Sequence, residues 1–463
     1  MAVSTAAGRP PNIVVVTCHD LGRHLGCYGA TVQSPHLDTF AADAVRFARA
    51  FCTAPQCSPS RASLYTGRYP HENGVMGLTH ANFAWDLHPD ERHIGQILRD
   101  AGYRTALVGI HHESRRDTQG RVAARCGMDE MYPPARGAAT SDVALECLRR
   151  FAAGDHPFYL QIGYLEPHRI PARDETDAMG FRGDYIAPDD AANVQVPPYL
   201  RDDLGTRTEI AELNGAVHYV DAQIGRVLDG LRDLGLDENT LVVFTPDHGL
   251  ALPRAKCSLY EPGLEVALLV RWPTRGWSGR RTENALVPNV DVFATLVEAA
   301  GLPVAANVTG RSLAPLLDRD ASYTPRDHLF AEMTYHDYYD PRRSLRTEQW
   351  KVIVNFTAAP AFMDPSQSWR PRSTAVTPIN QYHPLVELYN LDADPVELTN
   401  LAENPAHADT RRDLLTRLHE WMRDTGDPLL AGAVTSPMHT QAVSALTDSE
   451  YRGVANPSPV ENV

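Results

Sequence analysis

Four short runs of mostly β-branched and aliphatic residues recur through the first 245 residues of the chain. They occupy residues 12–17, 105–109, 158–162 and 241–245. Runs of this length, without alternation of polar residues, are typical of strands buried on both faces of a parallel sheet. A long helical pattern at residues 210–234 and shorter ones elsewhere separate them. We therefore predict an α/β fold with a large, mixed, mostly parallel central sheet flanked by helices.

Each run is followed at once by polar residues that suit a reactive site. The carboxyl ends of parallel strands meet at one edge of a sheet, which is where ligands bind in open α/β folds. We expect the side chains that follow the four runs to converge there. They are His19 and Asp20, then His111 and His112, then Glu166 and His168, then Asp247 and His248.

The pattern changes near residue 322. Residues 350–354 alternate as in an antiparallel strand, residues 385–389 suggest another, and residues 409–422 form a helical pattern. We predict a catalytic domain over residues 1–321 and a smaller C-terminal subdomain with an antiparallel sheet over 322–428. Residues 429–463 are small, polar and proline-containing, so we expect a tail that is disordered or wraps a neighbouring subunit of a homo-oligomer.

Charge and composition narrow the function. The formal net charge of −15 argues against nucleic acid and long polyanions, so we expect a small or terminal anionic substrate in a local basic pocket. No apolar run is long enough to span a membrane, and the N-terminus lacks a signal-peptide pattern, so we expect a cytoplasmic protein. The 7 cysteines, without CxxC spacing, fit reduced thiols.

The segment Cys57-Ser58-Pro59-Ser60-Arg61 combines a potential nucleophile with an anion site. Ser58 suits an N-cap and Pro59 the first helical position, which predicts a helix through about Tyr65. Cys57 would then precede a helix N-terminus, where backbone N–H groups favour negative charge. The guanidinium of Arg61 would point back over the same place.

This segment resembles the sulfatase signature C-x-P-S-R, and similar motifs follow in the family's order from residue 11 to about residue 428. In sulfatases the signature cysteine is oxidised to formylglycine, so the resemblance implies that Cys57 is modified by a formylglycine-generating enzyme. Within the family the chain is most similar to the N-sulfoglucosamine sulfohydrolase branch. The motifs that carry this similarity are residues 57–64, 167–169, 259–263 and 387–390.

The resemblance also implies one divalent metal ion. Its expected ligands are Asp20, Asp247, His248 and the converted Cys57, with His19 standing where the family has a second aspartate. Calcium is usual in sulfatases and is our first expectation. Imidazole nitrogen among the ligands shifts preference toward manganese or zinc, which stay open.

Catalytic roles follow from the same resemblance. Arg61 would help to hold the nucleophile, His112 would act as base, His168 would protonate the leaving group, and Lys256 would face the sulfate. Ile110 replaces the family's lysine, and His111 is the candidate to substitute for it. Weaker candidates for sugar recognition are Glu166, Glu332 and Arg343.

The sequence thus predicts hydrolysis of a sulfate ester or sulfamate on a small or terminal sugar, with release of sulfate. Three alternatives stay open. One is a phosphonate monoester or phosphodiester hydrolase of the same superfamily, suggested by the Asp247-His248 pair. Another is a non-catalytic binding homologue, because of Ile110 and His19. The third is a phosphatase-like site in which Cys57 stays unmodified.

Overall fold

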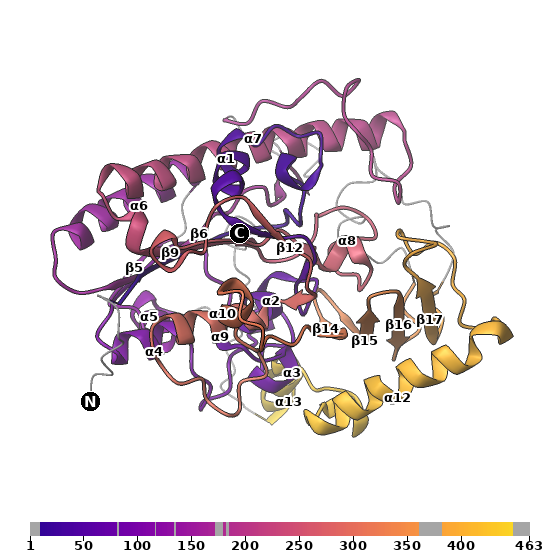
Figure 1. Ribbon diagram of the computed structural model, residues 1–463. Helices are drawn as coiled ribbons and strands as arrows, with labels where there is room; N and C mark the ends of the chain where they lie inside the picture. The colour runs from indigo at the N-terminus through magenta and orange to yellow at the C-terminus, as the bar shows by residue number, and fades with distance from the viewer. Residues whose placement is uncertain are drawn as a thin grey trace.

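The computed structural model describes residues 10–80, 83–115, 117–133, 136–171, 179–181, 185–360 and 382–447. Its main feature is an eight-stranded sheet in the order β12-β2-β11-β9-β1-β6-β4-β5 (Figure 1). β11 is antiparallel to both of its neighbours, and every other pair is parallel. The predicted mixed, mostly parallel sheet is confirmed. The strands are β1 (Asn12–Cys18), β2 (Val45–Phe47), β4 (Arg104–Gly109), β5 (Glu130–Tyr132), β6 (Phe158–Gly163), β9 (Thr240–Pro246), β11 (Leu269–Arg271) and β12 (Arg281–Glu283).

Helices cover both faces of this sheet (Figure 1). One face carries α1 (Pro35–Asp43), α6 (Gly137–Ala152) and α7 (Leu204–Asp233), and the other carries α2 (Cys57–Thr66), α4 (Ile94–Asp100) and α9 (Val290–Ala299). β1 shows why both faces are apolar: Ile13 and Val15 join one hydrophobic core, and Val14 and Val16 join the other. Shorter helices are α3 (Pro70–Asn73), α5 (Gln119–Cys126), α8 (Glu261–Leu264) and α10 (Ala314–Leu317).

A second, four-stranded antiparallel sheet follows in the C-terminal part. It runs in chain order through β14 (His328–Tyr335), β15 (Tyr339–Thr347), β16 (Trp350–Asn355) and β17 (Val386–Asn390). α12 (Ala408–Asp424) lies along it, and Leu414 and Leu418 pack with Leu345, Val352 and Leu388 (Figure 1). This matches the predicted small antiparallel sheet with a helix. Beyond it, α13 spans Pro437–Thr447, so this part of the expected tail is helical, and residues 448–463 lie outside the described residues.

The two sheets are joined beside the signature segment. The backbone N–H of Glu332 on β14 donates to the carbonyl of Thr53 (2.9 Å). Gln56 Nε2 donates to the carbonyl of Tyr335 at the end of β14 (2.8 Å). The C-terminal sheet therefore lies directly against the residues that precede Cys57.

Local details differ from the sequence predictions. Helix α2 begins at Cys57 with Gln56 as its N-cap, not at Ser58, because the Ser58 hydroxyl bonds to Thr79 instead of capping. Helix α1 ends at Asp43, since the chain turns into β2.

The apolar run at residues 266–270 is divided between two strands in different sheets. β11 belongs to the large sheet, whereas β10 (Glu265–Val266) pairs with β3 (Ala50–Phe51) in a three-stranded sheet completed by β13 (Val287–Pro288). The segment between β6 and α7 contains a short pair of strands, β7 (Ile170–Pro171) and β8 (Met179–Gly180), while residues 172–178 and 182–184 lie outside the described residues.

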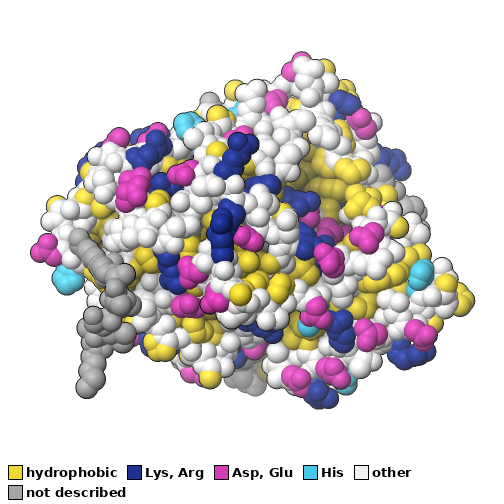
Figure 2. Space-filling model, viewed as in Figure 1, with side chains coloured by type: hydrophobic (Ala, Val, Ile, Leu, Met, Phe, Trp, Pro, Cys, Tyr) yellow, Lys and Arg dark blue, Asp and Glu magenta, His cyan; other side chains and the backbone are white. Residues whose placement is uncertain are grey.

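No helix in the described part of the chain is long and apolar enough to cross a membrane. On the face shown in Figure 2, acidic and basic side chains are interspersed over the surface. This is consistent with the mixed charge composition of the sequence.

Candidate active site

Four adjacent strands of the large sheet deliver the predicted site residues. β9, β1, β6 and β4 are neighbours and parallel, so their carboxyl ends share one edge. The residues that follow these strands, listed in sheet order, are Asp247 and His248, His19 and Asp20, His168, and His111 and His112. The side chains of Asp247, His248, His19, Asp20, His168 and His112 meet at this edge as predicted, whereas that of Glu166 does not join them.

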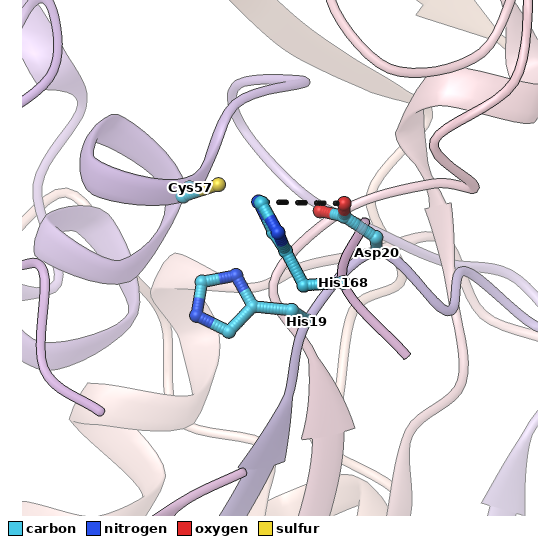
Figure 3. Close-up of side chains that lie close together, drawn as sticks. All are labelled: His19, Asp20, Cys57 and His168. Carbon is cyan, nitrogen blue, oxygen red and sulfur yellow. Dashed lines mark ion pairs between the residues drawn. The ribbon is translucent and has the colours of Figure 1, made fainter. Parts of the chain in front are cut away.

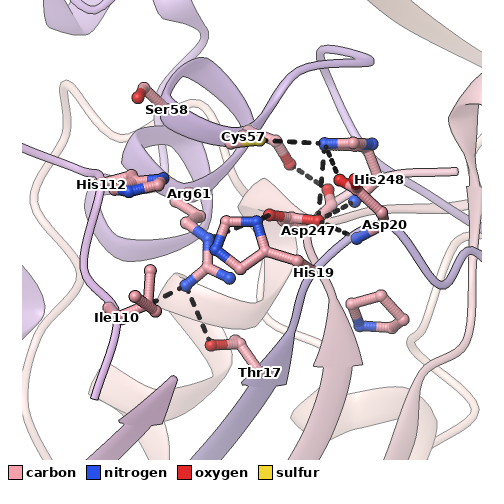
Figure 4. Close-up of polar contacts among 12 residues, drawn as sticks. Thr17, His19, Asp20, Cys57, Ser58, Arg61, Ile110, His112, Asp247 and His248 are labelled. Atoms are coloured by element: carbon pink, nitrogen blue, oxygen red, sulfur yellow. Dashed lines mark hydrogen bonds and ion pairs between the residues drawn. The ribbon is translucent and has the colours of Figure 1, made fainter. Parts of the chain in front are cut away.

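The N-terminus of α2 meets this edge. Cys57 is the first residue of the helix and is buried, and its Sγ lies 3.3 Å from His248 Nε2 (Figure 4). Figure 3 shows the sulfur directed toward the group formed by His19, Asp20 and His168. A helix N-terminus favours anions. The side chain of residue 57, and an anion bound beside it, would therefore lie in a positive electrostatic field.

Asp20 is the centre of a buried charge cluster. Lys256 Nζ lies 3.0 Å from both of its carboxylate oxygens, and His248 Nε2 lies 3.1 Å from Oδ1. Burial by itself would raise the pKa of Asp20, but the positive charge of Lys256 and the nearby His168 and His248 hold it below the usual value. Asp20 is therefore an ionised carboxylate prepared for a cation.

Asp247 forms the second half of this cluster. Its Oδ2 lies 3.0 Å from Arg61 Nε and 3.1 Å from His19 Nδ1, and its Oδ1 accepts from the backbone N–H of Asp20 (3.0 Å). Arg61 is fully buried and also donates to Thr17 Oγ1 (3.2 Å; Figure 4). The guanidinium is thereby fixed one turn behind Cys57.

The donor set fits a divalent cation. Ligand atoms of Asp20, Cys57, Asp247 and His248 all lie within 4.8 Å of one another, and those of His19, Asp20, Cys57 and His168 form an overlapping group. Two carboxylates with imidazole nitrogen suit calcium, manganese or zinc, so the ligand set by itself does not determine which ion binds. Lys256 Nζ, placed between the Asp20 oxygens, supplies positive charge where a cation would bind.

Two histidines, His168 and His112, flank the cluster. His168 Nε2 lies 3.4 Å from Lys256 Nζ and 3.8 Å from Asp20 Oδ2, while its Nδ1 hydrogen-bonds to the Arg169 carbonyl (2.5 Å). The His112 ring lies 5.1 Å from that of His19 between centroids. Burial is the main cause that lowers the pKa of His168 to about 4 and that of His112 well below the usual value.

Burial also acts on the signature cysteine. It raises the pKa of the Cys57 thiol to about 12, which keeps the unmodified side chain protonated at neutral pH. An unmodified Cys57 would therefore be a poor nucleophile in this environment.

Comparison with known proteins identifies the family. A family model described as Sulfatase matches residues 11–302. The chain belongs to the sulfatase family. A second model, the C-terminal region of N-sulphoglucosamine sulphohydrolase, matches residues 253–364 of this sulfatase. Human N-sulphoglucosamine sulphohydrolase is 28% identical to it, over 92% of this chain and 93% of the human protein.

Solved structures share its fold. A 2-O GAG sulfatase aligns with a TM-score of 0.69 and 20% identity over 92% of this sulfatase and 95% of that chain. A phosphonate monoester hydrolase from Silicibacter pomeroyi aligns with a TM-score of 0.69 and 20% identity, over 90% of this sulfatase and 96% of that chain. Family membership and its sulfatase relatives support hydrolysis of sulfate esters as its reaction class.

Three predicted recognition residues of this sulfatase lie in other networks. Glu332 contacts His71 Nδ1 (2.9 Å) and Arg343 (3.1 Å), and Arg343 also pairs with Asp427. All four side chains are almost completely buried between the C-terminal sheet and the region around α3. Their polar groups bind one another, so this cluster joins two parts of the fold and offers no surface to a sugar.

Glu166 is also directed elsewhere. Its Oε1 accepts from the backbone N–H of Gly137 at the start of α6 (3.3 Å) and from the Tyr185 hydroxyl (2.9 Å). The carboxylate therefore supports a helix N-terminus. His111, in contrast, is partly exposed beside His112, where a replacement for the missing lysine would be needed.

Several supporting residues of this sulfatase were not foreseen. Thr79 donates to the His112 carbonyl (3.0 Å) and its backbone N–H bonds to Ser58 Oγ (3.1 Å), which ties α2 to the strand end of β4. Glu113 accepts from the His112 backbone N–H (2.7 Å). The His80 ring lies 5.2 Å from the His112 ring. In the sequence, the one feature that could have indicated these residues is that Thr79 and His80 follow shortly after the signature segment.

Proposed function

We propose that this protein hydrolyses a sulfate ester or sulfamate on a small or terminal sugar of the N-sulfoglucosamine type, through a formylglycine made from Cys57. The observation that carries this proposal is the position of Cys57 Sγ, at the N-terminus of α2 and 3.3 Å from His248 within the Asp20–Asp247 cluster. The aldehyde hydrate of formylglycine supplies the attacking oxygen at that position.

The side chains around residue 57 have distinct tasks. Arg61 and Lys256 place two fixed positive charges beside the reacting group, and they offset charge on sulfuryl oxygens in the transition state. His168 Nε2 faces the centre, and once the negative charge of a bound sulfate group favours the protonated imidazole, it delivers a proton to the departing oxygen or nitrogen of the sugar. After the attack residue 57 carries the sulfate group, and His112, on the other side of His19, receives the proton of its second hydroxyl. The bond between the carbon of residue 57 and the sulfate oxygen then breaks, sulfate leaves and the aldehyde is restored.

A divalent cation would be held by Asp20, Asp247 and His248, with His19 and residue 57 as further ligands. When bound, it supplies a Lewis acid that stabilises negative oxygen at the site. Calcium is the first candidate, and manganese and zinc follow because of the imidazole donors.

The substrate assignment rests on the 28% identity to human N-sulphoglucosamine sulphohydrolase and on the charge of the protein. A net charge of −15 disfavours an extended polyanion, whereas Arg61 and Lys256 supply local positive charge for one anionic group. A single terminal sulfated sugar fits both properties.

The deciding experiment is the mass of the peptide that contains Cys57, from protein coexpressed with a formylglycine-generating enzyme. We expect a loss of about 18 Da relative to the cysteine form, together with release of sulfate from N-sulfoglucosamine. Cys57→Ser, which that enzyme does not convert, should show only the mass of its encoded serine peptide and no turnover. Full conversion without release of sulfate from any sulfated sugar would contradict the proposal.

A second candidate is a phosphonate monoester or phosphodiester hydrolase. It is favoured by the nitrogen-containing donor set of His19 and His248 and by the shared fold with a phosphonate monoester hydrolase. The converted protein should be assayed with an aryl sulfate, N-sulfoglucosamine, a phosphodiester and a phosphonate monoester at equal concentration. This candidate would be supported if kcat/KM is higher for either phosphorus substrate than for both sulfur substrates.

A further inference from the structure

The turn between β14 and β15 lies next to the signature segment. Tyr335, the last residue of β14, accepts from Gln56 Nε2 (2.8 Å) through its carbonyl, and Gln56 immediately precedes Cys57. The backbone N–H of Tyr335 donates to the Met76 carbonyl (3.0 Å). His336, Asp337 and Tyr338 follow and form this turn. The C-terminal sheet therefore carries its turn to the region of the active site.

His336 and Asp337 form a pair with one buried and one accessible member. His336 Nδ1 lies 3.1 Å from Asp337 Oδ2. The His336 side chain is 4% exposed, whereas that of Asp337 is 40% exposed. The buried His336 thus orients the carboxylate, while part of the Asp337 side chain stays accessible.

The neighbouring carboxylates have other tasks. Asp340 pairs with Arg342 and accepts from Thr357 (3.3 Å), and Glu332 is enclosed with His71 and Arg343. Both are almost fully buried. Among these three carboxylates, Asp337 is the one whose oxygens a ligand can reach.

The charges of the catalytic centre act on Asp337. Burial alone would raise its pKa, but His336 lowers it most strongly, and Lys256 and His80 lower it further. Lys256 belongs to the Asp20 cluster, and His80 lies beside His112. Asp337 is therefore an ionised carboxylate close enough to Lys256 and His80 for their charges to act on it.

We propose that Asp337, oriented by His336, binds the sugar ring that carries the sulfate by accepting hydrogen bonds from its hydroxyl groups, and that it disfavours a second anionic group on that ring. This inference rests on the proposed function and specifies its substrate class. It also transfers sugar recognition from Glu332 on β14, five residues before Asp337, to the exposed turn that follows this strand.

The chemistry of the pair supports this class of ligand. An ionised carboxylate only accepts hydrogen bonds, so its partner must be a donor such as a sugar hydroxyl. Hydrogen bonds to a charged group are stronger than neutral ones. A neighbouring sulfate or carboxylate would meet like charge, which provides discrimination by repulsion.

The test uses three substrates with full-length, converted protein. They are N-sulfoglucosamine, its analogue with a second sulfate at O6, and 4-nitrophenyl sulfate, which has no hydroxyl group. Asp337→Ala should raise KM for N-sulfoglucosamine about tenfold and leave kcat/KM for 4-nitrophenyl sulfate within about twofold. Asp337→Asn, which keeps the shape and removes the charge, should increase the kcat/KM of the disulfated sugar relative to the monosulfated sugar about tenfold.

Asp409→Asn is the matched control, because Asp409 is 94% exposed on α12 and makes the same change of charge. It should alter none of the three activities. Equal losses for the sugar and the aryl substrate in Asp337→Ala would overturn the inference, as would unchanged kinetics in both Asp337 variants.

A binding measurement separates this inference from the proposed function. In the Cys57→Ala background, which cannot be converted, Asp337→Ala should raise the Kd for N-sulfoglucosamine about tenfold without changing that for 4-nitrophenyl sulfate. If the wild-type protein releases sulfate and the Asp337 variants behave like it in both assays, the recognition role alone is refuted. Full conversion without sulfate release refutes the proposed function itself.

Discussion

At the scale of single residues, the site is a balance of buried charges. Asp20 and Asp247 bring two carboxylates into a fully buried space, and Lys256 and Arg61 bring two cations. Buried charges are stable only when paired and hydrogen-bonded. The function of each residue in this cluster and its contribution to folding are therefore linked.

Removing Arg61 should expose this link. Arg61→Met leaves Asp247 without its guanidinium partner, and breaking a buried ion pair from one side costs about 3–5 kcal/mol. Urea unfolding measures the change in free energy. Arg92→Met is the control, since the Arg92–Asp100 pair is more than half exposed and should contribute about 1 kcal/mol or less. Equal effects of the two substitutions would contradict the assignment of Arg61.

Metal binding should depend on Asp20. Adding calcium to chelator-treated protein should raise Tm, because a ligand at 100 times its Kd stabilises the folded state by about 2.7 kcal/mol. Asp20→Asn should lose most of this increase, and asparagine suits the positive φ of 51° at residue 20. Thermal unfolding with calcium, manganese and zinc in turn gives the preferred ion. An unchanged increase in Asp20→Asn would remove Asp20 from the ligand set.

At the scale of elements, the strand ends need close backbone contact. Gly163 ends β6, and a Cβ atom there would lie 2.0 Å from the Ile110 carbonyl oxygen. The Ile110 backbone N–H donates to the Gly163 carbonyl (2.8 Å), and the Ile110 carbonyl faces Arg61. Glycine at residue 163 thus permits β4 and β6 to end side by side below the signature helix.

Gly163→Ala should therefore destabilise the protein by about 1–3 kcal/mol, as overpacking usually does, and lower turnover with it. Gly120→Ala is the matched change in α5, where a Cβ atom meets nothing within 4 Å. It should leave stability unchanged or raise it by up to about 1 kcal/mol. Urea unfolding and sulfate release measure both. A harmless Gly163→Ala would contradict the close approach of the two strand ends.

At the scale of the whole molecule, a buried cluster connects the C-terminal sheet to the large domain. His71, at α3, bonds to Glu332 on β14 through its backbone N–H and its Nδ1. Burial lowers the pKa of His71, but Glu332 outweighs this and raises it above 6.5. Burial raises the pKa of Glu332, and His71 and Arg343 reverse this and hold it below 4.5. The pair is therefore ionised between these two values.

This predicts a pH dependence of stability. The raised pKa of His71 contributes to the free energy of unfolding fully below about pH 6.5, and this contribution is lost as the pH rises through the folded-state pKa. The lowered pKa of Glu332 contributes above about pH 4.5. His71→Asn should thus cost most near about pH 5.5 and less near about pH 8.5. Urea unfolding at both pH values tests it. His419→Asn, at an exposed position on α12, should have no such dependence.

Much of the fold could be predicted because local patterns specify it. The four apolar runs became β1, β4, β6 and β9, and the polar residues after them met at one edge. Element boundaries were less certain: Ser58 had the composition of an N-cap, yet its hydroxyl bonds to Thr79, 21 residues away. A competing long-range partner decides such cases, and the local sequence does not contain it.

The sequence by itself determined the strands, their reactive edge and the signature Cys57–Arg61, because side-chain alternation and residue type act over a few neighbours. The tertiary structure alone decided the pairing of Lys256 with Asp20, 236 residues apart, and the enclosure of Glu332 with His71 and Arg343. Which charges meet depends on how distant elements pack. For the same reason only the folded chain could place Asp337 beside the signature segment.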